Sequence, residues 1–122
     1  MALVLVVDDD PVFREIAAET LAQAGHRSLA AEDGAAALAL APDGPPDAAI
    51  VDMLMPNRDG IETIADLKAR WPGLKVIAVS AGARLLDPGL LLRAAATLGA
   101  DATLQKPVGK DQLTAALAAL LG

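Results

Sequence analysis

Short apolar runs alternate with helical patterns along this chain, and this alternation constrains its fold more than any other feature. The strand-like runs are LVLVV (3–7), RSLAA (27–31), AAIV (48–51), LKVIAV (74–79) and DATLQ (101–105). Helical patterns are strongest over 11–24 and 60–71, and also fit 34–41, about 88–98 and 109–121. Strands that alternate with helices form a parallel sheet with helices on both faces. We therefore predict an α/β fold, a (βα)5 three-layer sandwich whose five-stranded parallel sheet has the order 2-1-3-4-5.

Composition excludes several classes of protein. The 122 residues fit one domain, 1–122, and no second domain is expected. The absence of cysteine and the single histidine exclude disulfides, thiolate zinc sites and multi-histidine metal sites. A net charge of −6 repels phosphate backbones, so direct nucleic-acid binding is not expected. The apolar runs are too short to span a membrane and no signal peptide is recognisable, so we expect a cytoplasmic protein.

Polar residues follow the predicted strands at the edge where open parallel sheets bind their ligands, the carboxyl ends. These residues are Asp8, Asp9 and Asp10 after the first strand, Asp52 after the third, Ser80 after the fourth and Lys106 after the fifth. Because the first and third strands are neighbours in the predicted order, we expect Asp8, Asp9 and Asp52 to converge in one pocket. Asp10 precedes Pro11, a pattern that favours a helix cap over direct metal contact.

Three neighbouring carboxylates repel one another, and a hard divalent cation relieves that repulsion. Carboxylates, a backbone carbonyl and water are the ligands of Mg²⁺, and Mn²⁺ would accept the same set. A pocket that also holds an ammonium and a hydroxyl group suits a phosphoryl group. An ionised aspartate in it can act as the nucleophile that accepts this group.

Four stretches together resemble the receiver domain of two-component response regulators, in particular single-domain chemotaxis-type receivers. They are VVDDDPV (6–12), AAIVDMLMPNRDG (48–60), AVSA (78–81) and QKP (105–107). Each ends or follows a predicted strand, and the resemblance covers essentially the whole chain. It implies the flavodoxin-like version of the predicted fold, and phosphorylation by a histidine kinase or a histidine phosphotransfer protein.

The resemblance also implies a role for each site residue. Asp52 would be the phosphorylated residue and one of the metal ligands. Asp9 would bind the metal directly, Asp8 mainly through water, and Leu54 through its backbone carbonyl.

The remaining implied roles belong to the phosphate side of the pocket. Ser80 would be the switch hydroxyl and Lys106 would pair with the phosphate. The bond between Lys106 and Pro107 is expected to be cis by the same resemblance. The protein would then not be an enzyme, beyond its own phosphorylation from a phosphodonor and a slow autodephosphorylation.

One position departs from the family pattern. Receivers usually carry an aromatic residue three positions before the lysine, and Thr103 stands there in this chain. In the family, movement of the switch hydroxyl is coupled to rotation of that aromatic ring. Without the ring, this coupling is in doubt for this chain. The downstream target, which is an unknown protein, is expected on the face formed by helix 4 (about 88–98), strand 5 (101–105) and helix 5 (109–121) of the predicted fold.

Two other functions remain open at this point. A receiver fold could serve as a binding module that is never phosphorylated, and the missing aromatic favours that alternative. A haloacid-dehalogenase-type phosphatase is a more remote alternative, because Asp8–Val12 (DDDPV) reads as D-x-D-x-V after a strand. That interpretation makes Asp10 catalytic and leaves Asp52 unexplained. The phosphatase family also needs further acids after the lysine, and only Asp111 follows Lys106 in this chain.

Overall fold

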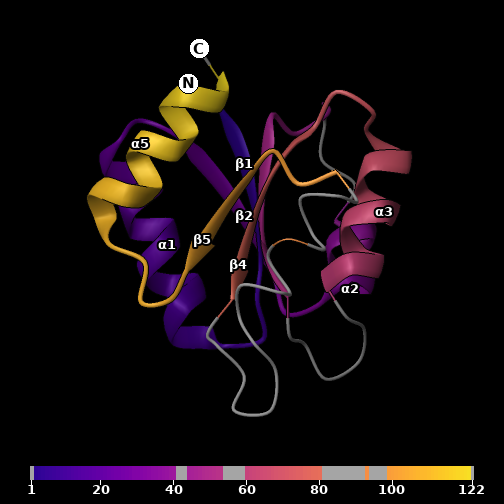
Figure 1. The fold of residues 1–122 in the computed structure, drawn as a ribbon, viewed down its shortest axis with the longest axis horizontal. Helices are drawn as coiled ribbons and strands as arrows, with labels where there is room; N and C mark the ends of the chain where they lie inside the picture. Colours follow the sequence, from indigo (N-terminus) through magenta and orange to yellow (C-terminus); the bar gives the residue numbers. More distant parts are fainter. Residues whose placement is uncertain (1, 41–43, 54–59, 81–92, 94–98, 122) are drawn as a thin grey trace.

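The computed structural model describes residues 2–40, 44–53, 60–80, 93 and 99–121 (Figure 1). Its elements are β1 (Leu3–Val7), α1 (Pro11–Gln23), β2 (Arg27–Ala31), α2 (Gly34–Ala39), β3 (Ala48–Asp52), α3 (Gly60–Arg70), β4 (Lys75–Ser80), β5 (Ala102–Gln105) and α5 (Lys110–Leu121). The predicted elements in these ranges are confirmed, with ends that differ by one or two residues. The helix expected at about 88–98 lies outside the described residues, apart from Arg93.

The five strands form one parallel sheet in the order β2-β1-β3-β4-β5, as predicted. β1 pairs with both β2 and β3, and Val7 lies opposite Ala31 on one side and Val51 on the other. The more polar runs, β2 and β5, form the two edges, and the apolar runs form the interior of the sheet. The strand order reverses at β1 and β3, so the carboxyl ends of these two strands are where a ligand is expected.

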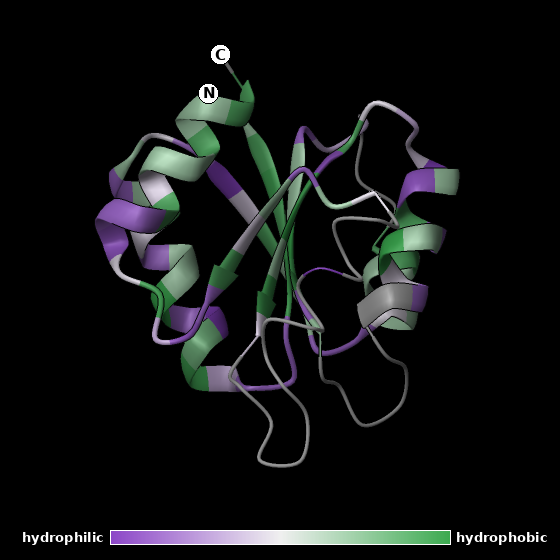
Figure 2. Cartoon of the chain, viewed as in Figure 1, coloured by the Kyte–Doolittle hydropathy of each residue, from purple (hydrophilic) through white to green (hydrophobic). Residues whose placement is uncertain are grey.

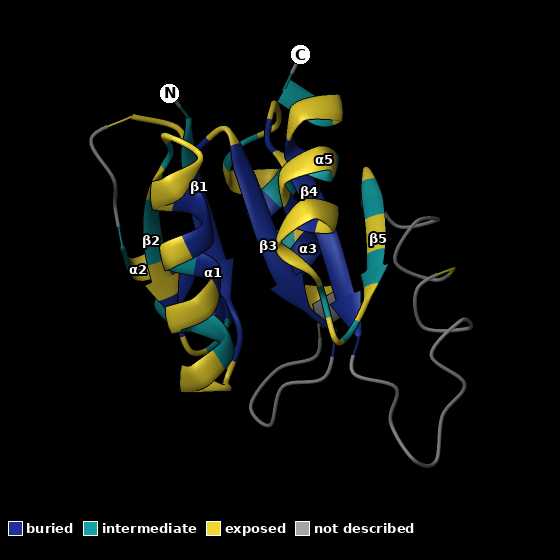
Figure 3. Cartoon of the chain, turned by 90° about the vertical axis from the view of Figure 1, so that its left-hand side faces the viewer, coloured by how far each residue is buried: buried dark blue, intermediate teal, exposed yellow. Residues whose placement is uncertain are grey.

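Side chains alternate between two cores, one on each face of the sheet. Helices α2 and α3 cover one face, and α1 and α5 cover the other (Figures 1 and 3). Leu5 and Val7 point into the core under α2 and α3, whereas Val4 and Val6 point into the core under α1 and α5. β3 and β4 follow the same alternation. The central strands of the sheet are coloured mainly as hydrophobic in Figure 2. Because both faces are covered, these strands need apolar residues at every position.

No helix in the described part of the chain is long and apolar enough to cross a membrane.

Asp101 connects the start of β5 to β4 through hydrogen bonds and to α3 through an ion pair. Its N–H group donates to the Val76 carbonyl at 2.7 Å, and its Oδ2 atom accepts from the Val76 N–H group at 2.8 Å. The same oxygen lies 2.9 Å from Lys68 Nζ on α3. Partial burial raises the pKa of Asp101, but the bonds from Lys68 and Val76 and the charges of Lys68 and Lys75 outweigh it and lower the pKa below 3.8.

This lowered pKa makes a prediction about acid stability. A carboxyl whose pKa is lower in the folded state contributes stability above its unfolded pKa, and loses that contribution as the pH falls through the folded value. We expect Asp101→Asn to be less stable than the wild type at pH 7, by about 1 kcal/mol because the ion pair is partly exposed. The difference in stability between the two proteins should become smaller below about pH 4. Urea unfolding between pH 3 and 7 measures it, and a gap independent of pH would contradict the assignment.

Candidate functional site

Three carboxylates meet at the carboxyl ends of β1 and β3. Asp8 and Asp9 follow β1, and Asp52 is the last residue of β3. Among the described residues, one oxygen from each of these three side chains lies within 4.8 Å of the other two. Asp8 and Asp52 are buried, with 1% and 5% of their surface exposed, and Asp9 is exposed. The predicted convergence of these acids is therefore confirmed.

The strands carry the two buried acids into the interior. Val4–Val7 and Ala48–Val51 are almost completely buried, so the residues that follow them start from the middle of the core. The backbone remains fixed beyond each run: the Asp8 N–H group donates to Ala31 and the Met53 N–H group donates to Val79. These main-chain bonds thus fix the backbone at both buried acids.

Asp8 has a partner for each side-chain oxygen. Its Oδ2 atom lies 2.7 Å from Lys106 Nζ, and its Oδ1 atom accepts a hydrogen bond from the Asp10 N–H group at 2.9 Å. The backbone carbonyl of Asp8 accepts a bond from Arg14 Nη1 at 2.7 Å. Burial of a carboxylate is costly unless it is paired and hydrogen-bonded, and Lys106 supplies the opposite charge.

Lys106 reaches the acids from the loop after β5. Its N–H group donates to the Ser80 carbonyl at 2.7 Å, so the end of β5 is tied to the end of β4. The Lys106–Pro107 peptide bond is cis, as expected. Its ammonium nitrogen also lies over the ring of Phe13, 4.3 Å from the ring centroid. One cation therefore contacts both an acid of the cluster and an aromatic ring of α1.

Asp10 has a different task from its two neighbours. Its Oδ1 atom accepts a hydrogen bond from the Val12 N–H group at 2.9 Å, and α1 begins at Pro11. The prediction that Asp10 caps this helix is confirmed. The row of three aspartates is thus divided between the acid cluster and the start of α1.

The other predicted site residues have different positions. Ser80 is the last residue of β4 and is fully buried, beside the strand that ends in Asp52. Thr103 lies on the edge strand β5 and is exposed, in the position where the family carries an aromatic. Leu54, the expected backbone ligand, lies outside the described residues.

A magnesium ion fits this donor set. Asp8, Asp9 and Asp52 each offer one carboxylate oxygen, these oxygens lie within 4.8 Å of one another, and oxygen is the ligand atom that Mg²⁺ prefers. The exposure of Asp9 leaves one side of the cluster open to the water molecules that Mg²⁺ retains. Asp8, Asp9 and Asp52 would hold the ion, which would neutralise negative charge in the pocket.

An apolar surface lies next to the cluster. A hollow of about 390 Å³ is lined by Asp10, Val12, Phe13, Ile16, Lys106, Pro107 and Val108. Within it Val12 is 61% exposed and Ile16 is 50% exposed, and in the described part of the chain these are the two exposed large apolar side chains. We call these two residues the α1 patch.

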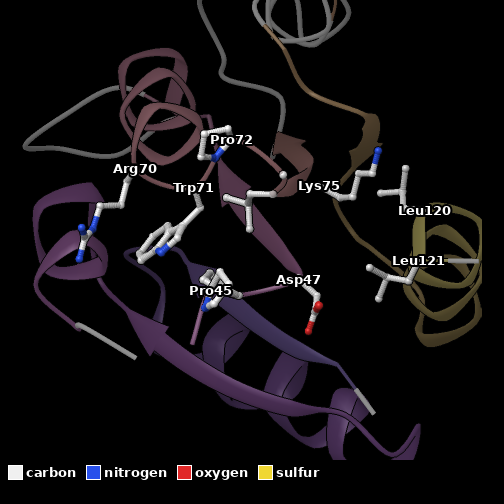
Figure 4. Close-up of a pocket in the computed structure, with 11 residues that line it drawn as sticks. Pro45, Asp47, Arg70, Trp71, Pro72, Lys75, Leu120 and Leu121 are labelled. Atoms are coloured by element: carbon white, nitrogen blue, oxygen red, sulfur yellow. The ribbon is translucent and has the colours of Figure 1, made fainter. Parts of the chain in front are cut away.

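A second hollow, of about 540 Å³, lies at the opposite end of the sheet (Figure 4). Trp71, Pro45, Leu120 and Leu121 are among the residues around it. It holds none of the predicted site residues, and its acid, Asp47, accepts a bond from the Leu3 N–H group. Its size alone therefore does not make it the functional site.

Two contributors to the acid cluster were not expected from the sequence. Neither Phe13 nor Arg14 was among the predicted site residues. Both lie in the first turns of α1, which starts two residues after Asp9. The helix start at Asp10–Pro11 was the available signal, because it places the first turn beside the strand ends.

Comparison with known proteins agrees with this geometry. The family model described as the response regulator receiver domain matches residues 4–118. The transcriptional regulatory protein KdpE of Mycobacterium tuberculosis is 36% identical over 119 residues, which is 98% of this chain and 50% of the relative. The response regulator MprA of a Mycobacterium species is 35% identical over 97% of this chain and 50% of its own length. The chain thus spans about half the length of these curated relatives.

Solved structures share the fold over nearly the whole chain. A CheY-like receiver domain protein from Methanospirillum hungatei superposes with a TM-score of 0.87 at 26% identity, covering 99% of this chain and 94% of that one. The chemotaxis protein CheY4 of Vibrio cholerae superposes with a TM-score of 0.87 at 28% identity, covering 99% of both chains. The flavodoxin-like arrangement expected from the sequence is thereby confirmed.

Proposed function

Because this chain belongs to the response regulator receiver family, we propose that it accepts a phosphoryl group on the Asp52 carboxylate. The observation that supports this most directly is the cluster itself. Asp52 ends a buried strand within 4.8 Å of two further carboxylates, and one of these is paired with Lys106. This arrangement combines a nucleophile, acids that suit a metal and a fixed cation.

The proposed reaction is a direct transfer between two residues. An oxygen of the Asp52 carboxylate forms a bond to phosphorus while the bond from phosphorus to the imidazole nitrogen of a phosphohistidine breaks. The electron pair of that bond stays on the nitrogen of the donor, and an acyl phosphate results. Lys106 balances the charge that accumulates, and the Ser80 hydroxyl bonds to a phosphate oxygen. Bound Mg²⁺ would supply further charge neutralisation.

The α1 patch supports a protein as the phosphodonor. Val12 and Ile16 are exposed apolar residues within the hollow that also contains Lys106. A donor that covers them would bury apolar surface and bring its histidine to the open side of the acid cluster. We propose a histidine kinase or a histidine phosphotransfer protein for this role, and a cytoplasmic location as part of the same proposal.

Phosphorylation would change which proteins the chain binds. The new group adds about 1.5 to 2 negative charges next to Lys106 and Ser80, both at the end of the β4–β5 pair. We propose that the signal leaves through the face made by the helix predicted at about 88–98, by β5 and by α5, although that helix lies outside the described residues apart from Arg93. By similarity to KdpE, a transcriptional regulator by name, a DNA-binding module is one candidate for the target.

Phosphate incorporation from a small phosphodonor tests the proposal. Incubation with phosphorus-32 acetyl phosphate and Mg²⁺ should label the wild type with about one phosphate per chain, in a bond that hydroxylamine cleaves, as expected of an acyl phosphate. Chelation of the metal should reduce the rate by about 100-fold, because several kcal/mol of charge stabilisation is lost. Asp10→Ser keeps a helix cap and should label normally. A wild type that incorporates no phosphate would instead favour the unphosphorylated binding module.

Phosphate release by the wild type and by Asp8→Asn, Asp10→Ser and Asp52→Asn addresses the phosphatase alternative. A haloacid-dehalogenase-type enzyme would release phosphate repeatedly from a small substrate, and would lose this activity in Asp8→Asn and Asp10→Ser. A receiver would release phosphate only slowly, by hydrolysis of its own acyl phosphate, and only while Asp52 is present. We propose that the chain is a phosphoacceptor and not an enzyme, and repeated turnover that survives Asp52→Asn would contradict this.

A further inference from the structure

We infer that Phe13 is a positioning residue for Lys106: its ring holds the ammonium group inside the pocket. This inference rests on the proposed function for its consequence, but its structural part can be tested separately. The observation that carries it is the double contact of one nitrogen atom. Lys106 Nζ lies 2.7 Å from Asp8 Oδ2 and 4.3 Å from the centroid of the Phe13 ring.

The position of Lys106 makes this ring contact stronger than a surface one. Its side chain is only 17% exposed, and Asp8 is 1% exposed, so water competes little for the ammonium group. Cation–π contacts gain strength when the cation loses water. The second such pair in the described part of the chain, Arg70 over Trp71, has a longer distance of 5.4 Å, and both residues line a hollow remote from the acids.

A long lysine side chain needs such support. Lysine loses more conformational freedom than most residues when its ammonium group is fixed. Lys106 comes from the loop after the edge strand β5. With Asp8 on one side and the Phe13 ring on another, the charge is already in place before a phosphoryl group arrives. Less ordering is then required during the transfer itself.

A plain packing role is the competing explanation for Phe13. The ring also contacts the core between the sheet, α1 and α5 as a partly buried residue. A leucine would preserve much of that apolar contact but has no aromatic face, whereas a tyrosine preserves the face. A packing role therefore predicts similar behaviour of Phe13→Leu and Phe13→Tyr, and a positioning role predicts that only Phe13→Tyr resembles the wild type.

Nuclear magnetic resonance of the unphosphorylated protein tests the contact directly. Protons above the face of a ring are shifted upfield, so the ε-methylene and ammonium protons of Lys106 should lie upfield of those of Lys68 and Lys110. The shift should persist in Phe13→Tyr and in the control Trp71→Leu, and disappear in Phe13→Leu. Lys106 signals that keep their upfield shift in Phe13→Leu would overturn the inference. Lys106 signals that are not shifted in the wild type would also overturn it, and this result does not depend on whether Phe13→Leu folds.

Labelling with acetyl phosphate tests the consequence. We expect Phe13→Leu to incorporate phosphate about fivefold more slowly than the wild type, and Phe13→Tyr and Trp71→Leu to stay within about twofold. Equal rates for Phe13→Leu and Phe13→Tyr would overturn the positioning role. A wild type that shows the upfield shift but incorporates no phosphate would refute the proposed function and leave the contact between Phe13 and Lys106 established.

Discussion

Replacing Asp52 by asparagine is expected to abolish phosphate incorporation, with a loss of more than about 100-fold that matches removal of a catalytic nucleophile. The amide is a poor nucleophile, and no acyl phosphate can form on it. The side chain keeps its shape, and one charge leaves a cluster of three carboxylates. The fold should therefore survive, because repulsion within the cluster decreases. Mass spectrometry after exposure to acetyl phosphate and Mg²⁺ measures the incorporated phosphate.

Asp47→Asn is the matched control for this substitution. Asp47 lies just before the other end of β3, and its Oδ2 atom accepts a hydrogen bond from the Leu3 N–H group at 2.8 Å. An asparagine oxygen can keep that bond, so this variant should fold and label like the wild type. Normal labelling of Asp52→Asn would show that another residue accepts the phosphoryl group, and Asp8 would be the first to test.

Replacing Lys106 by methionine is expected to lower the free energy of unfolding by about 3 kcal/mol, because it leaves a buried carboxylate unpaired. Asp8 is 1% exposed and its Oδ2 atom bonds to Lys106 Nζ at 2.7 Å. Methionine has a similar length and keeps the apolar stem of the side chain, so the loss reports on the charge. Urea unfolding without divalent cations measures it. Labelling should also slow strongly, since no cation remains to balance the phosphate.

Two further variants separate the charge from other effects. Lys68→Met breaks the ion pair between Lys68 and Asp101, whose side chains are 27% and 25% exposed. The free energy of unfolding should fall by no more than about 1 kcal/mol. Adding Asp8→Asn to Lys106→Met removes the unpaired charge and should restore at least about half of the lost stability. Equal losses from Lys68→Met and Lys106→Met would contradict the importance of burial at the site.

Much of this fold can be read from the sequence, and the reason is visible in β1, β3 and β4. These strands are buried on both faces, so each is a continuous apolar run that differs from the helices around it. The polar residues that end the runs then mark the functional edge of the sheet. Asp8 and Asp52 were predicted to meet for this reason, and Asp10 was separated from them by the proline that follows it.

Contacts that depend on side-chain reach could not be predicted in the same way. Phe13 and Lys106 are separated by most of the chain, and nothing in the spacing of either residue indicates that the ring lies under the ammonium group. The bond from Arg14 to the Asp8 carbonyl is similar, because it depends on how α1 turns away from the sheet. Such contacts follow from the packing angle of a helix, which apolar periodicity does not determine.

The bond between Asp8 and Lys106 joins residues 98 positions apart, and this separation has a consequence during protein synthesis. During translation Asp8, Asp9 and Asp52 emerge from the ribosome before Lys106. The early chain therefore contains the three acids without the cation that balances them. Contacts at this separation also form late in folding, because a long loop must close. A partly synthesised chain would thus lack the ion pair between Asp8 and Lys106, and the site would be complete only after β5 and Lys106 have been translated.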